Sequence, residues 1–459
     1  MASNKARLTQ GPVGRHLVDM TLPVLFGVFT MMLQAFVDAW FIGQVGDREL
    51  AALGFTFPVL MLVSSVAIGL GAGTSSVVAR ALGANDHRRA RRLTTDSLLL
   101  SFGITAVISV AGILTIAPLF RLLGAPDDLI PLIGGYMRIL YAGVPFVVVG
   151  MVGMSSMRAT GDTRLPSLLM VITAVANVLL DPILIFGVGP IPALELNGAA
   201  MAAFIARGAL FAGALYFMRR RLDMLTFNRP DPGELRKSWA DILHVGIPAA
   251  GTNAIIPIAT GAITALLARY GPEAVAGFGV ASRVESLTLV IYYAMSAIIG
   301  PFVGQNVSAG KADRIYLALR LCTIFCLTSG LAIAALLAGS SRFLPSLFSD
   351  NPAVTDVATT FLLIAPLGYG AYGMVMVMNA SFNGMGKPMP GVAVSTIRLA
   401  GVYLPLAFIA DRLFGIAGIF GAYTVANIVT GATAYVWARS AVRSQCDKHG
   451  PSVVATEPV

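Results

Sequence analysis

The sequence predicts an all-α integral membrane protein with twelve transmembrane helices, arranged as two six-helix repeats of parallel topology. Three observations predict this class. The chain has 459 residues, of which 56% are hydrophobic and only 12% are charged, and its mean hydropathy of +0.78 lies far above that of soluble domains. Long apolar runs recur along the chain, and its two halves resemble each other. The runs are continuously apolar, whereas a transmembrane barrel would alternate apolar and polar residues.

Each apolar run is long enough to cross a bilayer as a helix, which takes about 20 residues. We expect the following spans: Leu17–Gly43, Leu50–Val78, Leu93–Phe120, Leu132–Met157, Leu165–Val188, Leu196–Met218, Ile242–Ala268, Ala274–Val303, Ile315–Gly339, Val354–Ala380, Met389–Ala410 and Phe414–Ala438. The first 16 residues are polar, so we expect no removable signal peptide.

The net charge of +9 is distributed as membrane topology requires. The two terminal segments and the even-numbered connections together hold 22 Lys and Arg residues, whereas the odd-numbered connections hold five. By the positive-inside rule, this asymmetry places both termini in the cytoplasm. The basic excess therefore reflects topology, and we expect no nucleic-acid partner.

The chain repeats itself at a period of about half its length. Gly150-Met151 recurs as Gly373-Met374, and Pro182 recurs as Pro405, at an offset of about 223 residues. Such duplication is typical of secondary transporters. We expect an N-lobe at residues 1–225 with spans one to six, and a C-lobe at residues 226–459 with spans seven to twelve and a short cytoplasmic tail.

The acids inside the spans are not repeated. Asp181 aligns with Leu404, Asn177 with Ala400, and Asp38 with Ile263. An ionised carboxylate inside a bilayer is costly, so such a group takes a proton, binds a cation or pairs with a base. A satisfied structural acid is the alternative. Because only one half carries these acids, we expect ion chemistry in the N-lobe.

Asp38 and Asp181 lie at similar depth, before the outer ends of spans that run in the same direction, and could face one cavity. Asn177 shares a helix face with Asp181, and Gln34 shares one with Asp38, because each pair is four residues apart. Pro182 is expected to kink the fifth span next to Asp181.

Further ionisable residues lie deep in the predicted spans. Glu285 is a second candidate for a coupling or substrate-binding acid, although it could equally form a structural pair with a nearby cation such as Arg283. Arg207, Arg320 and Arg398 are expected to snorkel or to brace packing. Arg138 is the remaining deep cation.

Two further patterns have competing explanations. Gly69 and Gly73 lie in a glycine-rich run that superficially resembles a phosphate loop, but the run follows no strand, so close helix packing is the better interpretation. Met151, Met154 and Met374 are thioethers that could line a cavity for varied apolar guests, or could simply be packing.

No pattern predicts an enzyme. The His and Cys residues do not occur at metal-ligand spacing, and no Ser/His pair falls within one span. We therefore expect no catalytic residues, no metal site and no cofactor.

Three segments together resemble the multidrug and toxic compound extrusion (MATE) transporters. They are the Phe36-Val37-Asp38-Ala-Trp-Phe-Ile-Gly43 end of span one, Gly161-Asp162-Thr163 before span five, and Asn177 to Pro182 followed by Asn197-Gly198-Ala199. The resemblance covers nearly the whole chain. It is closer to the DinF-like branch than to the NorM-like branch, because span seven carries no Glu.

The resemblance implies two lobes around a central cleft and alternating access, in a monomer of the bacterial inner membrane. It implies antiport of organic cations or other drugs against H⁺ or Na⁺. It assigns coupling to Asp38 and Asp181, support to Asn177, and a hydrogen bond to Asp38 from Tyr136. Relatives often carry Thr at the position of Ala203, and losing that oxygen ligand favours H⁺ over Na⁺.

The sequence thus predicts a secondary active multidrug antiporter that exchanges small-molecule drugs for H⁺ within the lipid membrane. Proton uptake by Asp38 or Asp181 would weaken the hold on the substrate, and mutual exclusion at shared carboxylates would couple the two fluxes. The alternative is a lipid or lipid-linked oligosaccharide flippase of the same broader superfamily. The deep arginines, which suit a phosphate headgroup, keep that alternative open.

Overall fold

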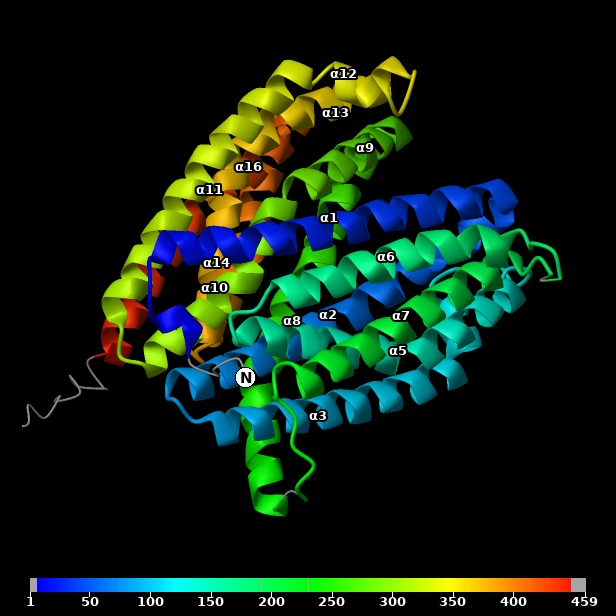
Figure 1. The fold of residues 1–459 in the computed structure, drawn as a ribbon. Coiled ribbons are helices and arrows are strands. Elements are labelled where there is room, and N and C mark those ends of the chain that lie inside the picture. The colour runs from blue at the N-terminus through cyan, green and yellow to red at the C-terminus, as the bar shows by residue number, and fades with distance from the viewer. Residues whose placement is uncertain (1–5, 191, 230, 447–459) are drawn as a thin grey trace, which may run out of the picture. The chain divides into compact units, whose positions relative to one another are not determined.

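The computed structural model describes residues 6–190, 192–229 and 231–446. All regular elements in these ranges are helices (Figure 1). The first half contains η1 (Arg7–Thr9), α1 (Val13–Val45), α2 (Asp47–Gly83), α3 (His87–Leu114), α4 (Ile116–Leu122), α5 (Ile130–Ala159), α6 (Arg164–Ile185) and α7 (Glu195–Arg220). The all-helical class that the sequence predicts is confirmed.

The second half continues with helices alone. It contains α8 (Pro232–Leu267), η2 (Ala268–Tyr270), α9 (Pro272–Thr288), α10 (Val290–Ser308), α11 (Ala312–Ser340), α12 (Phe343–Ser346), α13 (Pro352–Ile364), η3 (Ala365–Gly368), α14 (Tyr369–Gly384), α15 (Met389–Thr396), η4 (Ile397–Tyr403) and α16 (Leu404–Cys446). The η4 segment is a π-helix, and the other η segments are 3-10 helices. The tail at residues 447–459 lies outside the described residues.

Eleven helical stretches among the described residues are long and apolar enough to cross a membrane. The longest, Met389–Gln445, has 57 residues and contains two spans. Gly415 breaks the helix there with φ 57° and ψ −140°, a conformation that is nearly restricted to glycine. The chain folds back at this point, since a Cβ on Gly418 would lie 2.1 Å from the carbonyl oxygen of Ala410. The stretch therefore accounts for predicted spans eleven and twelve.

Some predicted spans are interrupted. Span three divides into α3 and α4 at Thr115, whose hydroxyl donates to the carbonyl oxygen of Ala111 (2.8 Å) and competes with regular helical bonding. Span ten contains η3, where Pro366 has no N–H to donate. Span eight divides into α9 and α10 at Leu289.

Contacts between residues divide the chain into two compact units. Unit 1 contains the described residues 22–78 and 86–250, and unit 2 contains 6–21, 79–85 and 251–446. Three of the four divisions therefore fall within α1, α2 and α8, and the fourth lies between α2 and α3.

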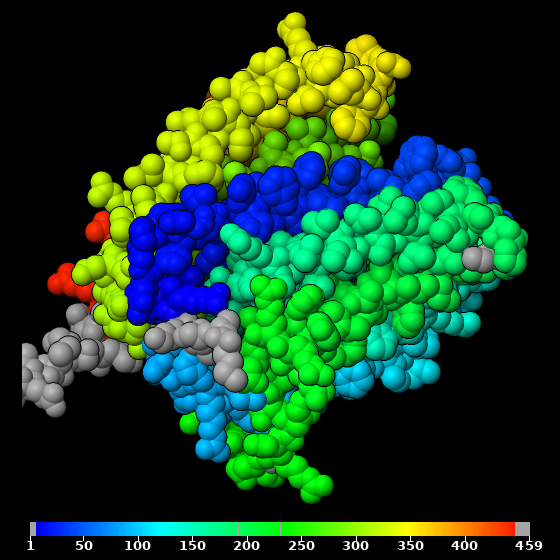
Figure 2. All heavy atoms as spheres, viewed as in Figure 1, coloured from blue at the N-terminus to red at the C-terminus, as the bar shows by residue number. Residues whose placement is uncertain are grey.

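In unit 1, α5 packs against α3 and α7, and α6 packs against α7. Gly69 and Gly73 let α2 approach the first part of α8: a Cβ on Gly73 would lie 2.3 Å from the carbonyl oxygen of Ile242. This confirms that the glycine-rich run serves close helix packing. The first turns of α8 and the segment before them, coloured green, project at the bottom of the view (Figures 1 and 2).

The segment that precedes α8 is tied to α3. Arg91 Nη2 donates to the carbonyl oxygen of Leu225 (3.0 Å), and Arg92 Nη1 donates to that of Asn228 (2.8 Å). Arg92 Nη2 also lies 2.6 Å from Oδ1 of Asp96, whose side chain is fully buried. The start of α3 therefore acts as a polar anchor for this connection.

In unit 2, α14 packs against α10, α11 and α16, and α9 packs against α13. The N-terminal η1 docks on α10, where Leu8 N donates to Gln305 Oε1 (3.1 Å) and Asn306 Nδ2 donates to the carbonyl oxygen of Leu8 (3.1 Å). The outer face of α11 is apolar and exposed, as at Leu331 and Leu336. Such a face suits lipid rather than water.

Candidate functional site

The candidate acids of unit 1 come from α1 and α6. Asp38 is half-buried near the end of α1, whereas Asp181 and Asn177 are 1% and 2% exposed on α6. Pro182 follows Asp181 inside α6, three residues before the helix ends at Ile185. Because Pro182 cannot donate to the preceding turn, the backbone next to Asp181 has an incomplete hydrogen-bond ladder.

Asn177 joins the two acids. Its Nδ2 donates to Asp181 Oδ1 (3.0 Å) and, at the longer distance of 3.5 Å, to Asp38 Oδ1. Gln34 Nε2 donates to Asp38 Oδ2 (3.2 Å) from one turn earlier on α1. The helical spacing of four residues in each pair produces these contacts. The structure therefore brings Gln34, Asp38, Asn177 and Asp181 together.

The two carboxyl groups interact electrostatically, and the amide of Asn177 reaches both of them. Among the described residues, no donor reaches Asp181 Oδ2, although this atom is buried. A buried acceptor without a donor is costly. Two neighbouring carboxylates also repel each other when both are charged. The arrangement is therefore suited to take up a proton or a small cation.

Tyr136 and Arg207 complete the surroundings of Asp38. Tyr136 on α5 is buried and lies within electrostatic range of both acids. In the described part of the chain its hydroxyl makes no hydrogen bond to Asp38, unlike the bond that the family resemblance implies. Arg207, near the middle of α7, interacts electrostatically with Asp38 and Tyr136.

The environment of Arg207 was not evident from the sequence, which suggested snorkelling or packing. The structure instead gives this mid-span cation a carboxylate and a phenol as electrostatic neighbours. Its depth alone could have identified it, since a charge in the middle of a span marks a functional region by default.

The three candidate methionines, Met151, Met154 and Met374, differ in how deeply they are buried. Met154 on α5 and Met374 on α14 are buried, and Met151 is half-buried. For Met154 and Met374 this burial fits interior packing, one of the two explanations that the sequence left open. Ala203 is a buried residue of α7 and offers no side-chain oxygen.

Glu285 belongs to a separate polar cluster in unit 2. Its Oε1 accepts from the hydroxyl of Tyr423 (2.9 Å), and its charge interacts with that of Arg398. Arg283 is exposed, so the cation nearest in sequence is not a buried partner of Glu285. Sequence reasoning did not foresee Tyr423 and Arg398 as neighbours of Glu285, because they come from α16 and η4.

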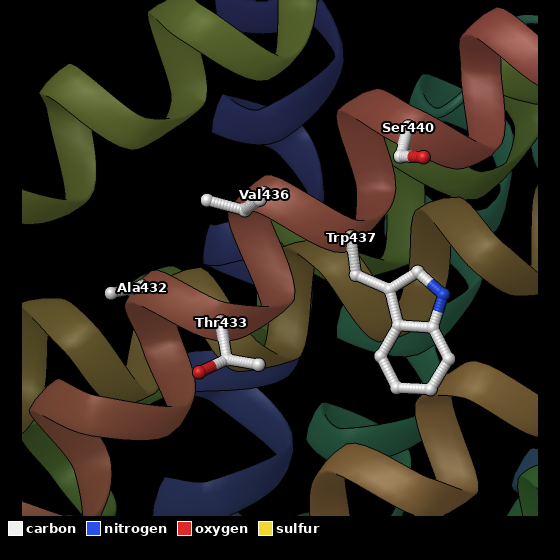
Figure 3. Close-up of a pocket in the computed structure, with 5 residues that line it drawn as sticks. All are labelled: Ala432, Thr433, Val436, Trp437 and Ser440. Atoms are coloured by element: carbon white, nitrogen blue, oxygen red, sulfur yellow. The ribbon is translucent and has the colours of Figure 1, made fainter.

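A shallow groove lies elsewhere, on α16, with a volume of about 590 Å³ (Figure 3). Its lining is Ala432, Thr433, Val436, Trp437 and Ser440. No ionisable side chain lines it, and none of the candidate site residues does, so we assign it no role in coupling.

The sequence matches a known protein family over most of its length. The MatE family model matches residues 23–183 and 248–409. A Shewanella oneidensis protein named "FAD transporter" is 38% identical over 94% of this chain and 96% of its own length. The "Probable multidrug resistance protein YoeA" of Bacillus subtilis is 25% identical over 94% of this chain and 95% of its own length.

Solved structures agree in fold. The Vibrio cholerae MATE transporter VcmN in the bent form has a TM-score of 0.90 and 32% identity, covering 94% of this chain and 98% of that one. A multidrug resistance MATE family transporter in an outward-facing conformation has a TM-score of 0.91 and 25% identity, covering 97% of this chain and all of the other. With a family model over most of its length and these relatives over nearly all of it, the chain belongs to the MATE family of membrane transporters and is not an enzyme.

Proposed function

We propose that this chain exports organic cations and other drugs in exchange for H⁺, with Asp38 and Asp181 as the coupling acids. The observation that carries the proposal is the pairing of the two carboxyl groups around Asn177, with Asp181 Oδ2 left without a donor. A proton placed between the acids removes their repulsion and supplies the missing donor. It also neutralises charge that would otherwise be carried through the bilayer.

The surroundings favour H⁺ over Na⁺. A hard cation needs several oxygen ligands at close range, and Ala203 supplies none. A proton needs only one carboxyl oxygen as its base and is tolerated in this setting.

Coupling follows from competition. A cationic substrate is attracted to the acids when they are ionised and is released when one of them is protonated. Because the two ligands stabilise different states of the carrier, an inward H⁺ gradient drives substrate outward. The proposed setting is the bacterial inner membrane, with both termini cytoplasmic and the chain acting as a monomer.

A second candidate substrate class follows from the 38% identical relative, which is named an FAD transporter. A flavin nucleotide is aromatic but anionic, so ionised carboxylates would repel it. Its export would need a positively charged side chain at a place away from the two acids, Asp38 and Asp181. Lipid flipping remains the third alternative.

The test uses full-length protein in proteoliposomes with an imposed pH gradient. We expect exchange of a cationic dye for H⁺ in the wild type and at least about 10-fold slower exchange in Asp38→Asn and in Asp181→Asn. Asp128→Asn is the matched control, because this exposed acid only pairs with Arg48 at the surface. Full drug–proton exchange in both site variants would refute the proposal.

Further arms of the experiment identify the ion and the cargo. Replacing the pH gradient with a Na⁺ gradient should abolish dye exchange, and Na⁺-driven exchange would reassign the ion. Fluorescent lipid included in the same vesicles reports on flipping. Lipid transfer without dye transport would favour the flippase alternative.

A further inference from the structure

Unit 2 encloses a polar cluster that contrasts with the diacid of unit 1. Arg398, on the π-helix η4, is 8% exposed and donates from Nη1 to Asn427 Oδ1 (3.1 Å). The guanidinium carbon lies 4.5 Å from the ring centroid of Tyr372 on α14. Glu285 and Tyr423 complete the cluster through their 2.9 Å hydrogen bond and the charge interaction of Glu285 with Arg398.

The unpaired atoms of this cluster are hydrogen-bond donors. Among the described residues, Arg398 Nε and Asn427 Nδ2 are buried without an acceptor. Arg398 is more than nine-tenths buried, and Asn427 is fully buried. At the diacid of unit 1, by contrast, the described side chains leave an acceptor unpaired, Asp181 Oδ2. Unpaired acceptors call for a proton or cation, whereas unpaired donors call for an anion.

The chemistry of the donors narrows the ligand class. A guanidinium offers a planar fork of donors that matches phosphate oxygens and can bind them through paired bonds. Arg398 already rests on one tyrosine ring, and Tyr423 and Tyr293 are half-exposed rings of the same cluster. Tyrosine faces stack against flat heteroaromatic rings.

We propose that Arg398 and Asn427 bind the phosphate of an aromatic, phosphate-bearing substrate of the flavin-nucleotide class. This subsite rests on the export function proposed above, with the second candidate substrate class as its cargo. It supplies the positively charged group that an anionic cargo needs and that Asp38 and Asp181 cannot provide. A π-helix places Arg398 here, and such wide turns occur frequently at functional sites.

Glu285 would compete with such a ligand for the guanidinium of Arg398. It is half-exposed, whereas Arg398 and Asn427 are buried. Its carboxylate offsets the charge of Arg398 while no ligand is bound. An incoming phosphate must replace this interaction, so removal of the Glu285 charge should strengthen binding.

The test is an equilibrium titration of purified full-length protein in detergent, read by flavin fluorescence. The probes are FAD, flavin mononucleotide and riboflavin, which share one ring system but differ in phosphate. In the wild type we expect both phosphorylated probes to bind about 10-fold more tightly than riboflavin, as charge-assisted bonds would give. Arg398→Gln should remove that difference and leave riboflavin affinity within about 2-fold.

Two further variants keep the result interpretable. Glu285→Gln should tighten FAD binding several-fold, a gain that misfolding cannot produce. Arg320→Gln, which removes an exposed arginine of α11, should change nothing. An equal loss for FAD and riboflavin in Arg398→Gln, an unchanged FAD affinity there, or no gain in Glu285→Gln would each overturn the proposal.

The two proposals fail separately. Titration in detergent involves no ion gradient, so an error about H⁺ coupling would appear only in the vesicle exchange of the Asp38 and Asp181 variants. An error about the phosphate subsite would appear only in the affinity difference between FAD and riboflavin.

Discussion

At the residue scale, Asn177 holds the diacid together. Its amide is 2% exposed and donates to both Asp181 and Asp38. An amide suits this position because it can donate to either carboxyl group without adding a charge of its own. A carboxylate here would add a third negative charge to a site that already crowds two.

Asn177→Ala should therefore destabilise the protein. The substitution leaves buried carboxyl oxygens without a donor, and the expected loss is about 1–3 kcal/mol. Thermal unfolding of the purified protein in detergent measures it as a lowered Tm. Asn228→Ala is the control, because this exposed side chain lies in the segment before α8. Equal Tm values for the two variants would show that the amide has no structural role.

At the element scale, α3 holds the connection to α8 through Arg92, whose guanidinium also forms a buried ion pair within α3. Asp96 is fully buried and lies 2.6 Å from Arg92, which also holds the carbonyl oxygen of Asn228. Surface pairs such as Arg121–Asp127, whose side chains are 62% and 80% exposed, are solvated when apart. Removing the arginine leaves a buried carboxylate in the first pair and a solvated carboxylate in the second.

Arg92→Leu should cost about 3–5 kcal/mol of unfolding free energy, because it leaves a buried carboxylate uncompensated. Arg121→Leu should cost about 1 kcal/mol or less, since Asp127 remains in water. Denaturant or thermal unfolding of both variants side by side provides the measurement. Similar losses in the two proteins would contradict the assignment of Asp96 as a buried anchor residue.

At the scale of the whole molecule, the distribution of basic residues predicts which connections face the cytoplasm. The segment between α7 and α8 is basic, whereas the connection that begins at the end of α4 belongs to the poorly basic set. Both expose side chains that can be replaced by cysteine: Phe227 is 76% exposed and Leu122 is 84% exposed. The natural Cys322 and Cys326 are buried and protected from reagents.

In a Cys446→Ser background, a membrane-impermeant maleimide should label Leu122→Cys in intact cells and should not label Phe227→Cys. After the cells are opened, both variants should react. We expect this labelling pattern because connections rich in Lys and Arg stay on the cytoplasmic side of the membrane. Labelling of Phe227→Cys from outside would reverse the topology.

Much of the architecture can be predicted from the local amino-acid composition. Composition, apolar runs and the repeat predict the helical membrane class, because burying a span in lipid depends on its own residues rather than on distant ones. Asp38, Asn177 and Asp181 stand out for the same reason, as polar groups in apolar runs. The break at Gly415 matches the predicted division between spans eleven and twelve.

The sequence by itself determined the helical spans, the duplication and the confinement of Asp38 and Asp181 to one half. Only the tertiary structure decided which polar groups meet across helices: Asn177 with Asp38, Arg207 near Asp38, and Arg398 with Asn427 and Tyr372. The physical reason is that hydropathy and spacing fix the depth of a residue and the helix face on which it lies. The partner on another helix depends on how each helix is rotated about its axis, and packing of the whole bundle sets that rotation.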